Sequence, residues 1–390
     1  MKTCCKNVNP TDVSYIEKYV AQCILDKIDR RDYSKFVSEY CSYTPKEIRK
    51  TGKNDKGNEI ILSAIHAISV DVSNRIKGGN LKLNQPKISM RKDGMTGKVR
   101  EIAIESIIQQ VMEHVAVGCM EELWKKKYVY HQYASLKGKG QHKGTKTIQK
   151  WTKENSTKYF VKSDVKKCFG SFEHKIVMKF LSRDIGKNKV LLLFVEELLK
   201  NHSENGVGLL IGSLLSQYIC NYMLSYAYRF IDGLYKTRRG KRIKLVRHIL
   251  FFMDDFLLTG NDRRNLVSAM RKTEKYLKNV LHLDVKEWHV KEHIKEKIDM
   301  MGFAVNYKGK IKVRHRVYHR ARRTAIRIWQ RDCFLKLSRR FCAYYGFLKL
   351  ARIRIINVPQ NITIKVKSTK MLAANNIRNF DRMEKSKCCA

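Results

Sequence analysis

Three aspartates at the ends of apolar segments could support metal-dependent phosphoryl chemistry. Asp164 follows the apolar run Tyr159-Phe160-Val161, and Asp254-Asp255 is framed by apolar residues on both sides. Carboxylates gathered at neighbouring strand ends repel one another unless a cation lies between them. Such oxygen ligands suit Mg²⁺, and two ions could stabilise both the attacking and the leaving oxygen of an in-line displacement. An acid pair alone is more often a solvated hairpin tip, so the prediction depends on the third acid and on the framing strands.

The spacing of apolar residues predicts the elements that hold these acids. The two segments around the acid pair predict a hairpin with both acids at its tip. The whole pattern predicts strands at 159–164, 245–253, 256–258 and 300–305, helices at 101–127, 174–201, 267–280 and 310–354, mostly helical residues 1–80, and a loop at 81–100. Strands interleaved with helices and followed by a helical basic module indicate an α+β core with an appendage.

The motifs around the acids match one family in sequence order. Phe252-Met253-Asp254-Asp255 resembles the Tyr-x-Asp-Asp box of reverse transcriptases, with Phe in place of Tyr. Ser163 to Phe169 resembles the family's first palm motif, an Asp followed five residues later by an aromatic residue. The segment Gly208 to Gln217 falls between them, where the family's template and nucleotide-positioning motif belongs.

This resemblance implies a fold and a reaction. The fold would be an α+β right-hand polymerase, with an N-terminal helical extension at 1–80, fingers and palm at 81–305, and a basic helical thumb and tail at 306–390. The reaction would be RNA-directed DNA synthesis by two-metal nucleotidyl transfer. Asp164, Asp254 and Asp255 would be catalytic and, together with Val165, would hold two Mg²⁺ ions, with Mn²⁺ as a substitute.

Further site residues follow from the same resemblance. Lys98 and Arg100 would clamp the triphosphate, and Phe169 would act as the steric gate under the incoming sugar. Lys286 resembles the family's late palm lysine near the leaving group. The residues implied to bind the nucleotide are Lys98, Arg100, Phe169, Gly212, Ser213, Gln217 and Lys286.

The middle motif indicates a subclass. Ile211-Gly212 and Ser216-Gln217 depart from the usual Gln-Gly and Ser-Pro, and they resemble the reverse transcriptases of diversity-generating retroelements. Lys286 to Val290 and Tyr344 to Lys349 resemble two further stretches of that group. The resemblance implies copying of a template-repeat RNA into cDNA with errors at template adenines, for mutagenic retrohoming. Because loss of a Gln amide removes a hydrogen bond at the nascent pair, we expect Ile211 and Gln217 to tune fidelity.

Charge predicts a polyanionic partner. The 390 residues include 80 Lys and Arg against 36 Asp and Glu, a formal net charge of +44. Residues 310–354 carry fifteen of these bases and a single acid, with aromatic side chains between them. A membrane surface is the rival partner, but the excess charge is spread over the chain, which favours nucleic acid. The residues expected to contact nucleic acid are Lys139, Arg322, Arg323, Arg327 and Tyr345.

Partners and location complete the expectations. We expect an RNA template, a DNA or RNA primer, dNTPs and a basic accessory protein, and no membrane partner. Scattered cysteines, with no signal sequence after Met1, predict a cytoplasmic protein. Two alternatives stay open: a reverse transcriptase of a group II intron, retron or phage-defence system, and a non-catalytic RNA-binding protein on a polymerase scaffold.

Overall fold

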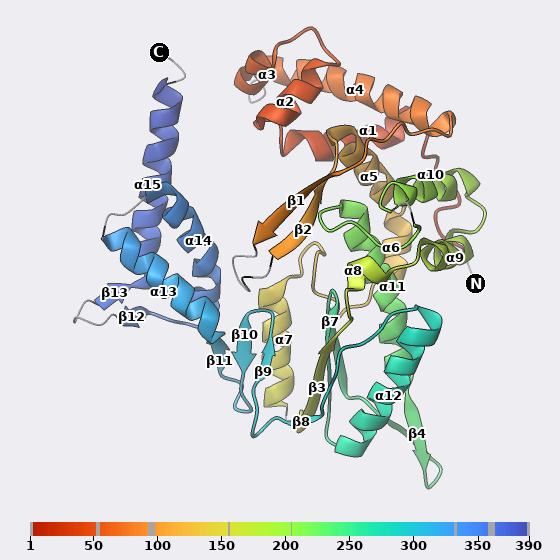
Figure 1. Ribbon diagram of the computed structural model, residues 1–390, viewed down its shortest axis with the longest axis vertical. Coiled ribbons are helices and arrows are strands. Elements are labelled where there is room, and N and C mark those ends of the chain that lie inside the picture. Colours follow the sequence, from red (N-terminus) through yellow and green to blue (C-terminus); the bar gives the residue numbers. More distant parts are fainter. Residues whose placement is uncertain are drawn as a thin grey trace.

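The computed structural model describes residues 3–51, 55–92, 97, 99–154, 157–203, 205–330, 334–357 and 363–387. Helices and strands are interleaved throughout (Figure 1), in agreement with the predicted α+β class. One large apolar core contains buried side chains from Cys4 to Val285, and a separate core lies within Phe303–Ala373. Among the described residues, no helix is long and apolar enough to cross a membrane.

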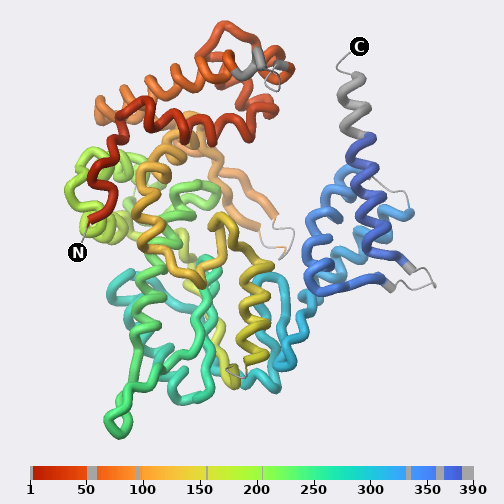
Figure 2. Tube along the Cα trace, turned by 180° about the vertical axis from the view of Figure 1, so that it is seen from behind, coloured from red at the N-terminus to blue at the C-terminus, as the bar shows by residue number. Residues whose placement is uncertain are grey.

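Residues 1–80 are mostly helical, as the sequence predicts, and their four helices lie at the top of the molecule in Figures 1 and 2. The Asp12 side chain caps the first helix by accepting hydrogen bonds from the backbone N–H groups of Ser14 and Tyr15. The helices are α1 (Val13–Leu25), α2 (Arg31–Ser38), α3 (Pro45–Thr51) and α4 (Asp55–Lys77).

Two sequence predictions are wrong in the next segment. Residues expected to form a loop contain a fingers hairpin, strands β1 (Lys87–Lys92) and β2 (Val99–Ile104). Nearly every side chain of this hairpin is at least partly exposed, so no alternation of buried and exposed residues marks its strands. The helix expected from residue 101 begins only at Ile107, because Ser106 caps it after β2 has ended. The helical part is α5 (Ile107–Cys119) and α6 (Glu121–Lys127).

A four-stranded antiparallel palm sheet, in the order β6-β7-β3-β8, lies at the centre. Alternate side chains of its strands belong to different cores: Val161 and Leu258 pack into the large core, whereas Phe160 and Leu257 pack into a smaller third core. Helix α7 contributes to the third core, and α11 and α12 contact the sheet from the side of the large core. The elements are β3 (Tyr159–Asp164), β6 (His248–Phe252), β7 (Asp255–Gly260), β8 (Lys291–Glu292), α7 (Gln141–Lys153), α11 (Leu214–Asp232) and α12 (Arg263–Val280).

Shorter elements connect and flank the sheet. The single helix expected over 174–201 is broken by Gly186, which has a φ of 65° and ends the first half. The strand expected over 300–305 is a hairpin that turns at Met301-Gly302, both with positive φ. These elements are α8 (Cys168–Ser171), α9 (His174–Ile185), α10 (Lys189–Lys200), β4 (Tyr235–Arg238), β5 (Lys241–Lys244), β9 (Ile298–Met300), β10 (Phe303–Val305) and β11 (Ile311–Val313).

The C-terminal part is a helical thumb that lies beside the rest of the chain (Figure 2). Helix α14 packs against both α13 and α15, and their apolar faces form the separate core. The thumb consists of α13 (His315–Trp329), α14 (Phe334–Leu350) and α15 (Val366–Lys387), with β12 (Ile355–Asn357) and β13 (Thr363–Lys365).

Candidate active site

The structure brings the three predicted aspartates to one end of the palm sheet. Strand β3 pairs with β7 so that Asp164 lies opposite Asp255, and Phe252 of β6 also pairs with Asp255. Met253 and Asp254 form the two-residue turn, and Met253 adopts a φ of 56°. The backbone N–H of Val165 donates to the Asp254 carbonyl at 3.2 Å, which ties the turn to the end of β3.

Burial and mutual repulsion destabilise two of these carboxylates. Burial raises the pKa of Asp254, and the charges of Asp255 and Asp164 raise it further. Burial also raises the pKa of Asp255, against the opposing effect of Lys162, whose Nζ lies 3.6 Å from the Asp255 carboxylate. A cation bound beside these carboxylates would stabilise their ionised forms and lower both pKa values.

Lys286 lies at the same strand end. Its Nζ donates to the Asp164 carboxylate, and its backbone N–H donates to the Asp164 carbonyl at 2.9 Å. The bond to Asp164 raises the pKa of the Lys286 ammonium group. The structure thus places Lys286 beside the predicted metal ligands.

The donor set fits Mg²⁺. Three carboxylates and the neighbouring Val165 carbonyl are hard oxygen donors, which this ion prefers. Burial, together with the charges of the neighbouring carboxylates, raises the pKa values of Asp254 and Asp255, so a bound cation would stabilise their ionised forms. Asp164, Asp254, Asp255 and the Val165 carbonyl are therefore the groups that would hold the metal.

Of the predicted nucleotide-binding residues, Arg100 lies near the acids and Phe169 follows β3 in the chain. Arg100 of β2 is close enough for its charge to lower the pKa of Asp254, against the larger effect of burial. Phe169 lies in α8, and its carbonyl accepts a hydrogen bond from the Leu209 backbone N–H at 2.6 Å. Lys98, predicted to act with Arg100, lies outside the described residues.

The segment Ile211–Ser213 connects the fingers hairpin to α11. The Ile211 carbonyl accepts a hydrogen bond from the Ala103 backbone N–H at 2.9 Å, and the Ile211 side chain is 39% exposed. Gly212 has a φ of 121°, and a Cβ there would lie 2.6 Å from the Ala103 carbonyl oxygen. Only glycine can adopt this positive φ and also lie this close to the Ala103 carbonyl oxygen without strain. Gln217 follows in the first turn of α11, where it is half-buried.

A buried polar network that the sequence did not predict holds this segment in place. Glu113 of α5 accepts hydrogen bonds from the Ser213 hydroxyl at 2.6 Å and from the Leu214 and Leu215 backbone N–H groups at 2.8 and 3.3 Å. His202 Nε2 lies 3.2 Å from the same carboxylate. A glutamate of another helix therefore satisfies the N-terminus of α11.

Glu105 completes the network. Ligand atoms of Glu105, Glu113 and His202 lie within 4.8 Å of one another, and all three side chains are buried. Burial and the neighbouring Glu113 carboxylate raise the pKa of Glu105 to about 9. Although burial alone would raise the pKa of Glu113, its bonds to His202, Glu105 and Ser213 hold it below the ordinary value. The pKa values of the two buried carboxyl groups are thus shifted in opposite directions, Glu105 upward and Glu113 downward.

The residues predicted to contact nucleic acid are dispersed. Arg323 and Arg327 are exposed on α13 and line one pocket, whereas Arg322 on the same helix is not among its lining residues. Lys139 donates to the Tyr130 carbonyl at 2.6 Å and lies 3.8 Å from the centre of the Tyr130 ring. Tyr345 is half-buried against the thumb core. Only Arg323 and Arg327 therefore share a site.

Comparison with known proteins supplies a family match. The family model "Reverse transcriptase (RNA-dependent DNA polymerase)" matches residues 68–305. No curated protein matches the chain.

Two solved structures are similar to the chain at low identity. Telomerase from Candida albicans, in complex with the TWJ fragment of telomeric RNA, is 12% identical with a TM-score of 0.40, over 77% of this chain and 62% of that chain. Apo telomerase from Candida tropicalis, truncated from its C-terminal domain, is 12% identical with a TM-score of 0.41, over 71% of each chain. The chain thus spans less than two thirds of the Candida albicans chain.

Proposed function

Because the chain belongs to the reverse transcriptase family, we propose that it extends a primer with deoxynucleotides on an RNA template and releases pyrophosphate. The observation that carries this proposal is the meeting of Asp164 with Asp255, and of both with Asp254, at one end of the palm sheet.

Each residue near the acids has a role in this reaction. Two Mg²⁺ ions, when bound by Asp164, Asp254, Asp255 and the Val165 carbonyl, would lower the pKa of the primer 3′-hydroxyl and neutralise the triphosphate. Lys286, which donates to Asp164, would neutralise the leaving group. Arg100 brings a positive charge from the fingers hairpin toward Asp254.

Selection of the nucleotide is assigned to the neighbouring segments. Phe169 would exclude a 2′-hydroxyl, and replacement by a smaller residue should permit ribonucleotide incorporation. Gly212, Ser213 and Gln217 would shape the pocket for the nascent base pair. Glu113 holds this segment in place, because it accepts hydrogen bonds from the Ser213 hydroxyl and from the first backbone N–H group of α11.

We further propose membership of the diversity-generating retroelement group. Its support is the departure of Ile211-Gly212 and Ser216-Gln217 from the usual Gln-Gly and Ser-Pro. The exposed Ile211 side chain cannot donate or accept hydrogen bonds, so it offers no check on base-pair geometry. On this proposal the cDNA carries errors opposite adenine, and a basic accessory protein acts with the enzyme.

Primer extension followed by cDNA sequencing tests both levels of the proposal. The reaction contains Mg²⁺, dNTPs and an adenine-containing RNA, with and without the accessory protein, and compares the wild type with Asp254→Asn. Asp232→Asn is the matched control, because Asp232 is an exposed carboxylate at the end of α11.

Each outcome separates the candidates. Asp254-dependent cDNA with errors opposite adenine supports the enzyme and the subclass. Accurate cDNA retains the enzyme and assigns it to the group II intron, retron or phage-defence reverse transcriptases. Retained synthesis by Asp254→Asn, or RNA binding without any synthesis, would contradict the proposed activity.

A further inference from the structure

The hairpin of β4 and β5 carries a dense positive charge. Six of its ten residues, Tyr235 to Lys244, are Lys or Arg, and none is acidic. Arg238 pairs with Lys241 across the hairpin, and the two-residue turn Arg239-Gly240 joins the strands. Both turn residues have positive φ, 50° and 73°, as a type I′ turn requires. Because this turn is tight, three cations stand together at its end, and we call Arg238, Arg239 and Lys241 the hairpin tip.

The hairpin projects from the end of the palm sheet opposite the aspartates. The Leu245 backbone N–H, directly after β5, donates to the Leu234 carbonyl at 2.9 Å and closes the base of the hairpin. This base lies against Gly260, the last residue of β7, whereas Asp255 is the first. Since a strand rises about 3.4 Å per residue, β7 covers about 17 Å and the hairpin adds about 10 Å, which places the tip on the order of 25 Å from the aspartates. Figures 1 and 2 show the hairpin at the end of the molecule away from α1–α4.

The base and the tip of the hairpin differ in how their cations are balanced. At the base, the Lys244 Nζ lies 2.7 Å from the Asp232 carboxylate, and the Lys236 Nζ lies 3.8 Å from that of Asp262. The three side chains of the hairpin tip are exposed, and among the residues that the structure describes they have no hydrogen-bond or ion-pair partner. The base is therefore tied to the palm, and the charge of the tip is left for an external anion.

The side chains of the hairpin favour a phosphate backbone as this anion. A segment that binds a membrane surface needs an apolar face beside its cations, and a protein interface needs an apolar or aromatic centre. Ile243 is the only aliphatic side chain in the sequence of the hairpin, and the Arg242 guanidinium lies over the Tyr235 ring at 4.4 Å from its centre. Guanidinium groups bind phosphate oxygens in pairs, and a tip without an aromatic ring offers no platform for stacked bases.

We propose that the hairpin tip binds backbone phosphates of the uncopied part of the template RNA, outside the primer–template duplex. The proposed reaction forms one base pair at a time at the aspartates, so the template beyond that pair is still RNA. The tip is too far from the aspartates to contact the pair being formed, but the uncopied strand can extend to it. This inference rests on the proposed function, because it requires an RNA template.

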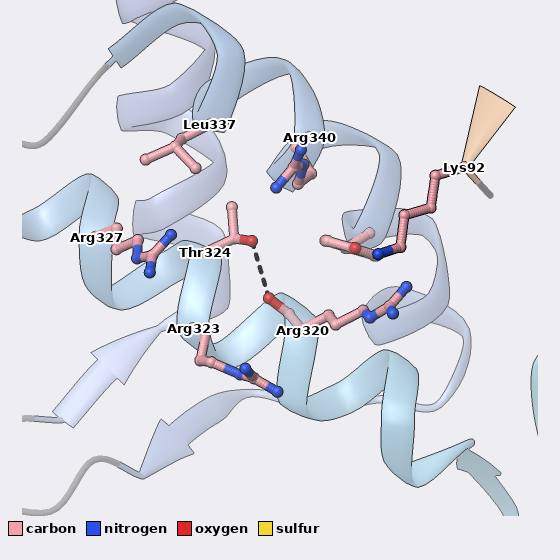
Figure 3. Close-up of a pocket in the computed structure, with 8 residues that line it drawn as sticks. Lys92, Arg320, Arg323, Thr324, Arg327, Leu337 and Arg340 are labelled. Carbon is pink, nitrogen blue, oxygen red and sulfur yellow. Dashed lines mark hydrogen bonds between the residues drawn. The ribbon is translucent and has the colours of Figure 1, made fainter. Parts of the chain in front are cut away.

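A second basic surface lies elsewhere on the molecule. The pocket between α13 and α14 of the thumb is lined by four arginines and is reached by Lys92 of the fingers hairpin (Figure 3). The hairpin tip belongs to the palm and to the opposite end of its sheet. The two surfaces can therefore contact different parts of one RNA, and variants of the tip test one of them alone.

Binding of two primer–templates that differ only in their uncopied RNA tests the inference. Both contain the same RNA–DNA duplex, and one has a long RNA overhang whereas the other has a short overhang that ends near the active site. Each is titrated with the wild type and with the triple variant Arg238→Gln, Arg239→Gln, Lys241→Gln over a range of salt concentrations, without dNTPs. Each phosphate contact to a single strand contributes about 0.7 to the slope of log K against log salt. We expect the triple variant to lose about two units of slope and about tenfold in affinity at low salt, for the long overhang only.

The matched control removes the same charge from another face. Lys35, Lys46 and Lys50 are exposed on α2 and α3, at the other end of the molecule in Figure 1. Replacement of all three by Gln should leave both slopes unchanged. Wild-type affinity of the hairpin variant for the short-overhang substrate shows that this variant is folded.

Three outcomes overturn the inference. An unchanged slope on the long overhang means that the hairpin tip does not contact RNA. Equal losses on the two substrates mean that the tip contacts the duplex and not the uncopied strand. Unchanged RNA binding, together with lost binding to phosphatidylserine vesicles, assigns the tip to a membrane surface.

Single-nucleotide addition on the short-overhang substrate keeps this test separate from the proposed function. We expect the triple variant to add one nucleotide at the wild-type rate, because the tip is far from the aspartates. If neither the wild type nor the variant adds a nucleotide, the proposed function fails, while the binding slopes still report whether the hairpin tip binds RNA.

Discussion

Two clusters of carboxylates lie in this molecule, and their surroundings differ. In the palm, Asp254 and Asp255 are partly exposed and have raised pKa values, with two lysines that only partly offset the repulsion. Glu105, which follows β2, and Glu113 in α5 are almost fully buried. Glu113 nevertheless accepts four hydrogen bonds and keeps a low pKa.

The difference separates a reactive site from a structural one. The donor atoms of Glu105, Glu113 and His202 converge within 4.8 Å, yet protein donors already occupy the Glu113 oxygens. A metal ion there would have to displace the bonds that hold α11. The palm carboxylates instead have lysine partners, Lys286 at Asp164 and Lys162 at Asp255, and the pKa values of Asp254 and Asp255 remain raised, so a bound cation would stabilise their ionised forms.

The largest effect that the comparison predicts is loss of catalysis without loss of stability. Asp255→Asn should lower the rate of synthesis about a thousandfold or more, because a metal ligand is lost. Its free energy of unfolding should stay within about 1 kcal/mol of the wild type or rise, since burial opposes the charge that is removed. Primer extension and urea unfolding measure the two quantities. A strongly destabilised variant would show that the palm acids are structural too.

Glu113→Gln should have the opposite profile. Its amide keeps one acceptor oxygen but loses the charge that faces His202 and the α11 N–H groups, at a cost of about 3 kcal/mol in unfolding free energy. The rate of DNA synthesis should fall only to the extent that the loss of these bonds displaces the segment around Ser213. Glu121→Gln is the control, because its exposed pair with Lys125 contributes only about 0.5 kcal/mol. If Glu113→Gln and Glu121→Gln had equal free energies of unfolding, the buried cluster would not be structural in the way we propose.

Gly212 precedes Ser213, which bonds Glu113, so its substitution tests whether this segment must be held in place for nucleotide selection. Gly212→Ala should cost about 2 kcal/mol and lower nucleotide selectivity, because the Cβ meets the Ala103 carbonyl and the φ is unfavourable. Gly206→Ala isolates the second cause, since Gly206 has a φ of 67° with no atom within 4 Å of its Cβ. Similar unfolding midpoints and error rates for both variants would show that contact with the fingers hairpin is unimportant.

The two clusters also differ in how far the sequence predicts them. Asp164, Asp254 and Asp255 follow apolar strands, and strand ends of one sheet meet in space, so local pattern suffices. Glu113 stands within an apolar helix, where a lone glutamate is a detectable signal of a buried charge. Its partners His202 and Ser213 lie about ninety residues or more along the chain, and no periodicity encodes that pairing.

The pocket lined by Arg323 and Arg327 of α13 is intermediate in how far the sequence predicts it. The i, i+3, i+7 arginines of α13 can be read from the sequence, which predicted Arg323 and Arg327 as nucleic-acid contacts. The contribution of Lys92 depends on the fingers hairpin, which was expected to be a loop because of Gly94 and Gly97, and whose apolar side chains Ile88, Met90 and Val99 are exposed. Ile88 and Met90 alternate with polar residues in β1, a strand pattern that the prediction of a loop did not take into account.

The last prediction concerns Glu105, whose contribution to stability depends on pH. Burial and the Glu113 charge raise its pKa to about 9, so the folded protein keeps a proton there that the unfolded chain releases near pH 4.5. Between these values the folded state binds more protons, and the free energy of unfolding falls as pH rises, by at most about 1.4 kcal/mol per pH unit from this group. Glu105→Gln mimics the protonated carboxyl, and its amide oxygen can still accept from Gln109. Its stability relative to the wild type should therefore rise by about 1 kcal/mol per pH unit from pH 5 to 9. Urea unfolding at several pH values measures the difference, and two parallel curves would mean that Glu105 is ionised beside Glu113.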